Sequence, residues 1–282
     1  MLRPILAAAA AVAVLAPVAY APAAYAADAQ LQAAVAGPQR SEAHKARDAH
    51  RHPVESLSFW GLKPNQTVVE ISPGSGYWTE ILAPYAKATG GTYVAAVADL
   101  DNPKLSDGAR KGRADFEAKY ADADKYGQIT YVGFGPASKP LGAPGSADLV
   151  LTARNLHNWA TQPGMLDKAM KDFHDVLKPG GVLAVEEHRK DPKPEAANWS
   201  DGYMSEATVI AAAEKAGFKL QARSEANANP KDTKDHPFGV WTLPPTRRTS
   251  PFGQPADPNF DRTKYDAIGE SDRMTLRFVK AG

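Results

Sequence analysis

The fold of this chain is decided by the stretch Val68-Val69-Glu70-Ile71-Ser72-Pro73-Gly74-Ser75-Gly76-Tyr77-Trp78-Thr79. It predicts a buried strand, a turn that carries Gly74 and Gly76, and the first turn of a helix. Glycine permits positive φ and a close approach of a ligand, and the free N–H groups of a helix N-terminus suit a carboxylate or a phosphate. The stretch therefore predicts a ligand-binding loop, with the Glu70 carboxylate facing a cationic or hydroxyl-bearing ligand.

Strands and helices alternate along the rest of the chain. Short apolar runs predict strands at 67–71, 92–97, 129–134, 148–152, 182–185, 218–220 and 274–279. Helical patterns lie between them, over 78–87, 109–120, 165–177 and 208–216. Apolar strands that alternate with helices are typical of parallel sheets covered on both sides. We therefore predict an α/β, Rossmann-like doubly wound fold with a mostly parallel, seven-stranded sheet and helices on both faces.

The first 26 residues have the form of a signal peptide. Arg3 provides a short basic region, residues 5–16 are an unbroken apolar run, and Ala24-Tyr25-Ala26 is a small-x-small cleavage site. The run is shorter than the roughly 20 residues that span a bilayer. We expect cleavage after Ala26, a periplasmic or secreted protein, and no stable membrane insertion of the mature chain.

The remaining chain divides into two parts. Residues 27–60 are predicted to be a leader and a helical cap, in which 27–39 are loose and 41–51 form a solvated helix with Ser41 as its N-cap. Residues 61–282 are predicted to form the α/β domain. Two long segments, at about 191–205 and 227–272, interrupt it on the side where such sheets bind ligands.

Composition excludes several classes of function. The chain has 33 Lys and Arg against 32 Asp and Glu, and this balance argues against nucleic acid as a partner. It has no cysteine, which excludes disulfides, thiolate catalysis and thiolate metal ligands.

The order of the motifs resembles that of the class I S-adenosylmethionine-dependent methyltransferases, and more narrowly their exported members in proteobacteria. The turn Lys178-Pro-Gly-Gly181 before an apolar strand is especially typical of that superfamily. Besides the stretch after Val68, the similar pieces are 47–53, 148–159, 177–183, 187–189, 216–218 and 272–278.

The resemblance implies S-adenosyl-L-methionine as the cofactor and an unidentified small molecule as the methyl acceptor. An acid after the second strand would bind the ribose hydroxyls; we favour Asp99, with Asp101 as the alternative. The chain departs from the usual pattern in having Ser72 where glycine is common and Gly133-Phe134-Gly135 where an adenine-binding acid is common. The cofactor-binding residues implied are Glu70, Ser72, Gly74, Gly76, Asp99, Phe134 and Asn155.

Candidate catalytic residues follow the fourth and fifth strands. His157 suits a general base because its ordinary pKa is near neutral, and Asn158 adjoins it. His188 and Arg189 follow the fifth strand, where an arginine can hold an acidic group bidentately. Two structural alternatives stay open: the first pair caps the next helix, or Arg189 belongs to an ion-pair network with Glu187 and the N-terminal segment.

Histidines and tryptophans give further candidates for the pocket. The resemblance implies that the segment with Arg47, Arg51 and His52 covers the cofactor pocket, where His52, His157 and His188 would converge. His44 and His50 are assigned to the solvated helix face, and a metal site is kept only as an alternative. The tryptophans best placed to wall the pocket are Trp159 and Trp199.

An exported S-adenosylmethionine-dependent methyltransferase is therefore the leading interpretation of the sequence. Export raises a difficulty, because this cofactor is made in the cytoplasm. An exported ligand-binding protein that keeps the fold without methyl transfer is the first alternative. A hydrolytic or isomerising enzyme that uses His157 and His188 is the second.

Overall fold

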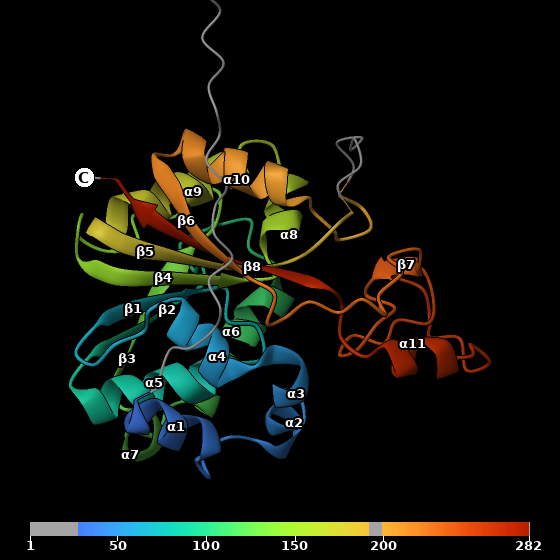
Figure 1. Ribbon diagram of the computed structural model, residues 1–282, viewed down its shortest axis with the longest axis horizontal. Helices are drawn as coiled ribbons and strands as arrows, with labels where there is room; N and C mark the ends of the chain where they lie inside the picture. Colours follow the sequence, from blue (N-terminus) through green and yellow to red (C-terminus); the bar gives the residue numbers. More distant parts are fainter. Residues whose placement is uncertain (1–27, 192–198, 282) are drawn as a thin grey trace, which may run out of the picture.

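In the computed structural model, which describes residues 28–191 and 199–281, a seven-stranded sheet runs through the middle of the molecule (Figure 1). Its strand order is β3-β2-β1-β4-β5-β8-β6. Strands β1 to β5 are parallel, and β8 lies antiparallel between β5 and β6. The strands are β1 (Thr67–Ile71), β2 (Thr92–Ala98), β3 (Ile129–Phe134), β4 (Ala147–Ala153), β5 (Leu177–His188), β6 (Phe218–Ser224) and β8 (Arg273–Lys280). The predicted doubly wound, mostly parallel sheet is confirmed.

Helices cover both faces of the sheet because neighbouring strand residues point to opposite sides. Val69 belongs to the apolar core on one side of β1, and Val68 belongs to the core on the other side. The first core contains residues of α8 (Leu156–Ala160), α9 (Met165–Val176) and α10 (Glu206–Lys215). The second contains residues of α1 (Ala29–Ala36), α4 (Pro53–Phe59), α5 (Thr79–Thr89), α6 (Asp107–Lys119) and α7 (Ala123–Tyr126).

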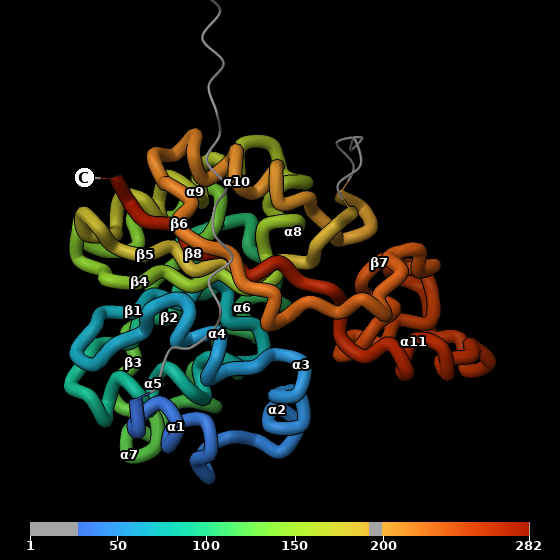
Figure 2. Tube along the Cα trace, in the orientation of Figure 1, coloured from blue at the N-terminus to red at the C-terminus, as the bar shows by residue number. Residues whose placement is uncertain are grey.

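The segment before β1 is packed on the domain, so the prediction of a loose leader and a solvated helix was wrong. Helix α1 buries Leu31 and contacts α5. Figure 2 shows α1, in blue, beside α5. In place of one helix over 41–51 there are two single turns, α2 (Glu42–Lys45) and α3 (Asp48–Arg51). His44 is buried, with its Nδ1 2.8 Å from the Glu80 carboxylate of α5 and its Nε2 hydrogen-bonded to the Ser75 hydroxyl at 3.1 Å. Arg40, His44 and Arg51 of this segment are thus buried, whereas Glu42 and His50 are exposed.

Two other regions differ in detail from the sequence analysis, and some of its predictions fall outside the described residues. Strand β5 starts at Leu177, before the Pro-Gly-Gly turn, and its pairing with β4 shifts register there. The segment 227–272 contains β7 (Pro237–Val240) and α11 (Thr263–Ile268), which stand beyond the carboxyl ends of the parallel strands (Figures 1 and 2). The predicted signal peptide, its cleavage site and residues 192–198 lie outside the described residues. Among the described residues, no helix has the length and apolarity needed to span a membrane.

The loop between β1 and α5 turns through left-handed backbone conformations. Ser72, Gly74 and Gly76 have φ of 50°, 60° and 88°. A Cβ atom at Gly76 would lie 1.9 Å from the hydroxyl oxygen of Tyr120, which bonds the carbonyl oxygen of Ser75 at 3.1 Å. A Cβ atom at Gly74 would meet nothing within 4 Å. Gly76 is thus required by packing, whereas Gly74 borders open space.

We expect alanine at these two glycines to have different effects on stability. Gly74→Ala should cost about 1 kcal/mol, the usual cost of a left-handed conformation for a residue with a Cβ. Gly76→Ala should cost about 3 kcal/mol, because Tyr120 must also move. Urea unfolding of both variants measures the difference. Equal losses would contradict the contact between Gly76 and Tyr120.

Candidate functional site

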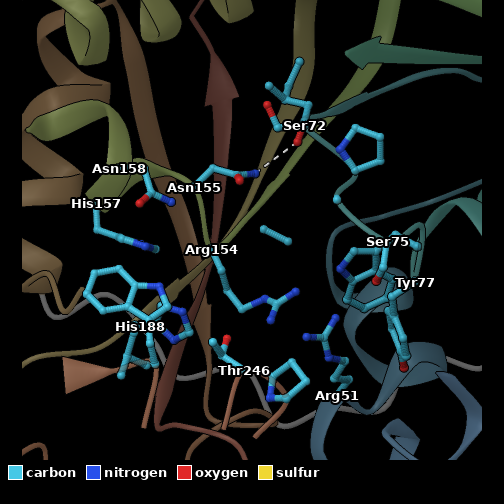
Figure 3. A pocket seen from close by; sticks show the side chains of 18 of the residues that line it. Arg51, Ser72, Ser75, Tyr77, Arg154, Asn155, His157, Asn158, His188 and Thr246 are labelled. Atoms are coloured by element: carbon cyan, nitrogen blue, oxygen red, sulfur yellow. Dashed lines mark hydrogen bonds between the residues drawn. The ribbon is translucent and has the colours of Figure 1, made fainter. Parts of the chain in front are cut away.

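A pocket opens at the carboxyl edge of the sheet, between the loops that follow β1 and β4 (Figure 3). Including its open mouth it encloses about 760 Å³. The segment after β7 closes one side with Trp241 and Thr246. Parallel strands direct their carboxyl ends to the same edge, which is where such folds bind ligands. The other lining residues are Arg51, Glu70–Ser75, Tyr77, Trp78, Ala153–Asn155, His157, Asn158, His188, Val240, Pro244 and Pro245.

One side-chain hydrogen bond links the two loops. The Asn155 amide donates Nδ2–H to the carbonyl oxygen of Ile71 at 3.0 Å, drawn as a dashed line in Figure 3. Arg154, just before it, has a φ of 61° and donates its backbone N–H to Glu186. This turn directs the Arg154 side chain into the pocket. Asn155 therefore has a structural role besides the cofactor contact implied by the resemblance.

Glu70 is a buried acid at the pocket wall. Its side chain accepts hydrogen bonds from Tyr93 at 2.5 Å and Thr79 at 2.9 Å, both at Oε2. Burial raises its pKa to about 7, although these two bonds and the charge of Arg51 act in the opposite direction. A positively charged group close to Glu70 would favour the ionised form of its carboxylate.

His157 is held by Glu187. Its Nδ1 lies 2.8 Å from Glu187 Oε1, and because an ionised carboxylate only accepts, Nδ1 carries the proton. The same oxygen accepts the backbone N–H of His188 at 2.8 Å, and Oε2 accepts those of Leu156 at 2.6 Å and His157 at 3.3 Å. Nε2 of His157 is thereby left as the proton acceptor on the pocket side.

His188 is the second imidazole of the pocket. Its ring centroid lies 5.2 Å from that of His157, so these two histidines converge as predicted. Burial, and then the neighbouring charges, lower its pKa well below the ordinary value, so it is neutral. Its Nδ1 bonds the hydroxyl of Ser271 at 2.6 Å.

A metal is poorly suited to the group formed by His157, Glu187 and His188. Potential ligand atoms of the three lie within 4.8 Å of one another. However, Glu187 already accepts four N–H groups, which is about what two carboxylate oxygens accommodate. The arrangement is suited to orienting an imidazole.

Some implied cofactor residues lie away from this pocket, toward the far strands of the sheet. Asp99 follows β2, is buried and accepts the backbone N–H of Asp101 at 3.1 Å. Asp101 is exposed and pairs with Lys139. Phe134 ends β3 and packs edge-on against Trp159. Asp99 and Phe134, the residues implied for the ribose and the adenine, thus both lie at strand ends along the carboxyl edge of the sheet.

Other predicted residues do not join the pocket. The Arg189 guanidinium contacts Asp272 at 2.9 Å and Glu225 at 2.8 Å. The ion-pair alternative thus describes its surroundings, with partners other than the predicted Glu187. His52 does not converge with the other two histidines, because its ring lies 3.3 Å from the Asn227 side chain and borders different hollows. Trp159 and Trp199 pack on the core.

The site residues selected from the sequence did not include Arg51, Arg154 and Trp241, which line the pocket, or Glu187 as the partner of His157. A signal was available for two of them. Arg51 lies in the motif 47–53, and Arg154 begins the segment that was selected for His157. The contribution of Trp241 has no local signal, since it depends on where the segment 227–272 folds back.

Comparisons with known proteins support the fold. No family model matches the chain. It is similar to the ubiquinone/menaquinone biosynthesis C-methyltransferase UbiE of Hydrogenovibrio crunogenus, with 29% identity over 160 residues, 54% of this chain and 53% of that protein. UbiE of Haemophilus ducreyi is 29% identical over 130 residues, 46% of this chain and 44% of that protein. The chain thus spans about half the length of these curated relatives.

Two solved structures share the architecture. The [4+2]-cyclase SpnF has a TM-score of 0.50 and 14% identity, covering 87% of this chain and 85% of its own. The CurJ carbon methyltransferase also has a TM-score of 0.50 and 14% identity, covering 86% of this chain and 56% of its own. The chain therefore has the Rossmann-like fold of the class I S-adenosylmethionine-dependent methyltransferases.

Glu70 should make the stability of the protein depend on pH. The folded-state pKa of about 7 exceeds the ordinary 4.5, so the folded protein holds this proton more tightly than the unfolded chain does. This contribution is complete below the ordinary pKa and is lost as the pH rises through 7. The loss should reach about 3 kcal/mol.

The measurement is urea unfolding of the wild type and of Glu70→Gln at several values from about pH 5 to about pH 8. The wild type should lose stability relative to the variant as the pH rises. Glu117→Gln, at a more exposed helical carboxylate, serves as the control and should keep the wild-type slope. A Glu70→Gln curve parallel to that of the wild type would contradict the prediction.

Proposed function

We propose that this protein is an S-adenosylmethionine-dependent methyltransferase that is exported and acts on a small molecule. The observation that carries the proposal is one pocket at the carboxyl edge, in which the glycine loop after β1 faces His157, held by Glu187. The partial sequence similarity to C-methyltransferases supports it, and the fold is compatible with it.

The residues around the loop fit this cofactor. The space beside Gly74 is open, and Glu70 is a buried acid whose ionisation a cationic ligand would favour. Glu70, Ser72 and Gly74 would hold the methionine part, Asp99 the ribose and Phe134 the adenine. Gly76 supports the loop from behind, where Tyr120 covers it.

S-adenosylmethionine supplies a methyl carbon activated by its sulfonium: the acceptor atom bonds to this carbon as the carbon–sulfur bond breaks, and the electron pair stays on sulfur. The protein positions the acceptor and receives its proton. His157 Nε2 is the proton acceptor, and Glu187 stabilises the imidazolium that forms. Neutral His188 and Asn158 border the same space and would orient the acceptor.

Export is supported by residues 1–26 alone. Their basic start, apolar run and cleavage site are typical of a signal peptide. The periplasmic protein should begin at Ala27, which N-terminal sequencing tests; a mature chain that keeps the earlier residues would reject it. An exported ligand-binding protein is the alternative, and the next measurement separates the two.

Calorimetric titration of the mature protein tests the proposed cofactor. S-adenosylmethionine and S-adenosylhomocysteine should both bind, and Gly74→Arg should abolish binding because the new side chain enters the pocket. The urea midpoint of this variant is the control for folding. The proposal would be rejected if neither ligand binds at about millimolar concentration, which corresponds to a binding free energy of about 4 kcal/mol at most. Binding that survives Gly74→Arg would place the cofactor elsewhere.

Variants of the pair formed by His157 and Glu187 test the proton acceptor. His157→Ala should lower methyl transfer by about 100-fold or more while leaving S-adenosylhomocysteine affinity within about twofold. Glu187→Gln should lower the rate less and shift its pH profile, because the imidazolium loses its buried partner. The readouts are turnover against pH and calorimetric affinity. Unchanged turnover in His157→Ala would reject its role.

A further inference from the structure

We infer that Arg51 and Arg154 form a binding site for one acidic group, a carboxylate or a phosphate, carried by the methyl acceptor. This inference rests on the proposed function and adds the chemical class of the acceptor. Figure 3 shows the two guanidinium groups pointing toward each other across the pocket, one from α3 and one from the loop after β4.

Arg51 is buried but incompletely paired. Its side chain is 0% exposed and lines the pocket. Nε lies 3.1 Å from Glu270 Oε2, and the guanidinium carbon lies 4.4 Å from the ring centroid of Tyr77. Nη1 and Nη2 have no hydrogen-bond partner among the described residues. A buried guanidinium with two unused nitrogens is expected to meet a ligand.

Arg154 is the second unsatisfied cation. No ion pair joins its guanidinium to another described residue, and its Nε is buried without a partner. Burial lowers the pKa of Arg154, and its positive charge in turn lowers the pKa of Arg51 to about 9, after the larger effect of burial. Two like charges that face one another at this depth are stabilised by an anion between them.

The surrounding charges leave a surplus of positive charge. Glu270 is shared by Arg47 at 2.6 Å, Arg51 at 3.1 Å and Arg273 at 2.9 Å, and Arg273 also pairs with Glu186 at 2.7 Å. Three arginines therefore share two carboxylates, and Arg154 adds a fourth positive charge that has no ion pair among the described residues. Glu70 is the remaining acid of the pocket wall, and it is already bonded to Tyr93 and Thr79.

The cofactor by itself does not match this charge. S-adenosylmethionine has one carboxylate but also an ammonium and a sulfonium, so its net charge is positive. An acceptor with an acidic group would restore neutrality between the two guanidiniums, and forked N–H donors match a carboxylate or phosphate geometrically. The carboxylate of the cofactor is the other source of the same chemistry, and the experiment distinguishes the two.

The experiment titrates benzoate, its neutral analogue benzamide and inorganic phosphate into protein saturated with S-adenosylhomocysteine, in a low-chloride buffer. Benzoate or phosphate should bind, and benzamide should bind about tenfold more weakly or not at all. Arg154→Met should lower the affinity for the anion by about tenfold or more, while the affinity for S-adenosylhomocysteine stays within about twofold. Arg51→Lys keeps the positive charge but not the forked N–H donors of the guanidinium, so it should lower the affinity for the anion less.

Arg223→Met is the matched control, because Arg223 is a partly buried arginine paired with Glu206 outside the pocket; it should leave all affinities unchanged. Weaker S-adenosylhomocysteine binding in Arg154→Met, with unchanged anion binding, would assign the arginines to the cofactor and overturn the inference. So would the absence of anion binding to the saturated protein.

Failure of the proposed function would be recognised separately. If S-adenosylhomocysteine does not bind at all, the methyltransferase proposal fails. Benzoate and phosphate titrated into the protein alone then still decide whether the arginine pair binds an anion, and an equal affinity of wild type and Arg154→Met would overturn that part as well.

Discussion

The parallel pairing of β1 with β4 is the constraint on which the site depends. Ile71 lies beside Thr152 in this pairing, so the two strands end at the same height of the sheet. After each of these strands the backbone turns through a residue in the left-handed conformation, Ser72 after β1 and Arg154 after β4. Asn155 joins the two turns through its bond to Ile71. The glycine loop and the histidine segment consequently face one pocket, although more than 70 residues separate them in the sequence.

Buried charge is the second organising feature. The N-terminal segment contributes Arg47 and Arg51, and the end of the chain contributes Glu270 and Arg273. Burying such groups is costly unless they are paired, and removing one partner leaves an uncompensated charge. The network therefore couples docking of α3 to the formation of the pocket wall. The two terminal nitrogens of Arg51 have no hydrogen-bond partner among the described residues, and neither has Nε of Arg154, so these atoms are available to a ligand.

The fold alone does not decide the chemistry. Of the two solved structures with a TM-score of 0.50, one is a [4+2]-cyclase and the other a carbon methyltransferase. What distinguishes one use of this fold from another is the set of side chains at the carboxyl edge. In this chain that set combines an oriented imidazole, a second neutral imidazole and two guanidiniums with nitrogens that have no partner among the described residues. Under the proposed function, this set would accept a proton from an acidic small molecule beside the methyl donor.

The sequence by itself determined the order of strands and helices, the glycine loop and the placement of His157 and His188, because these depend on local periodicity and on residues next to strand ends. Tertiary structure alone decided the rest. Arg189 follows β5 and Phe134 ends β3, as expected. Yet Arg189 meets Asp272, just before β8, and Glu225, just after β6, and Phe134 packs against residues of α8 and α9. Arg51 and Trp241 reach the pocket only because distant segments dock on it. Local pattern indicates where a strand or a helix lies, whereas long-range packing decides which side chains line the same pocket.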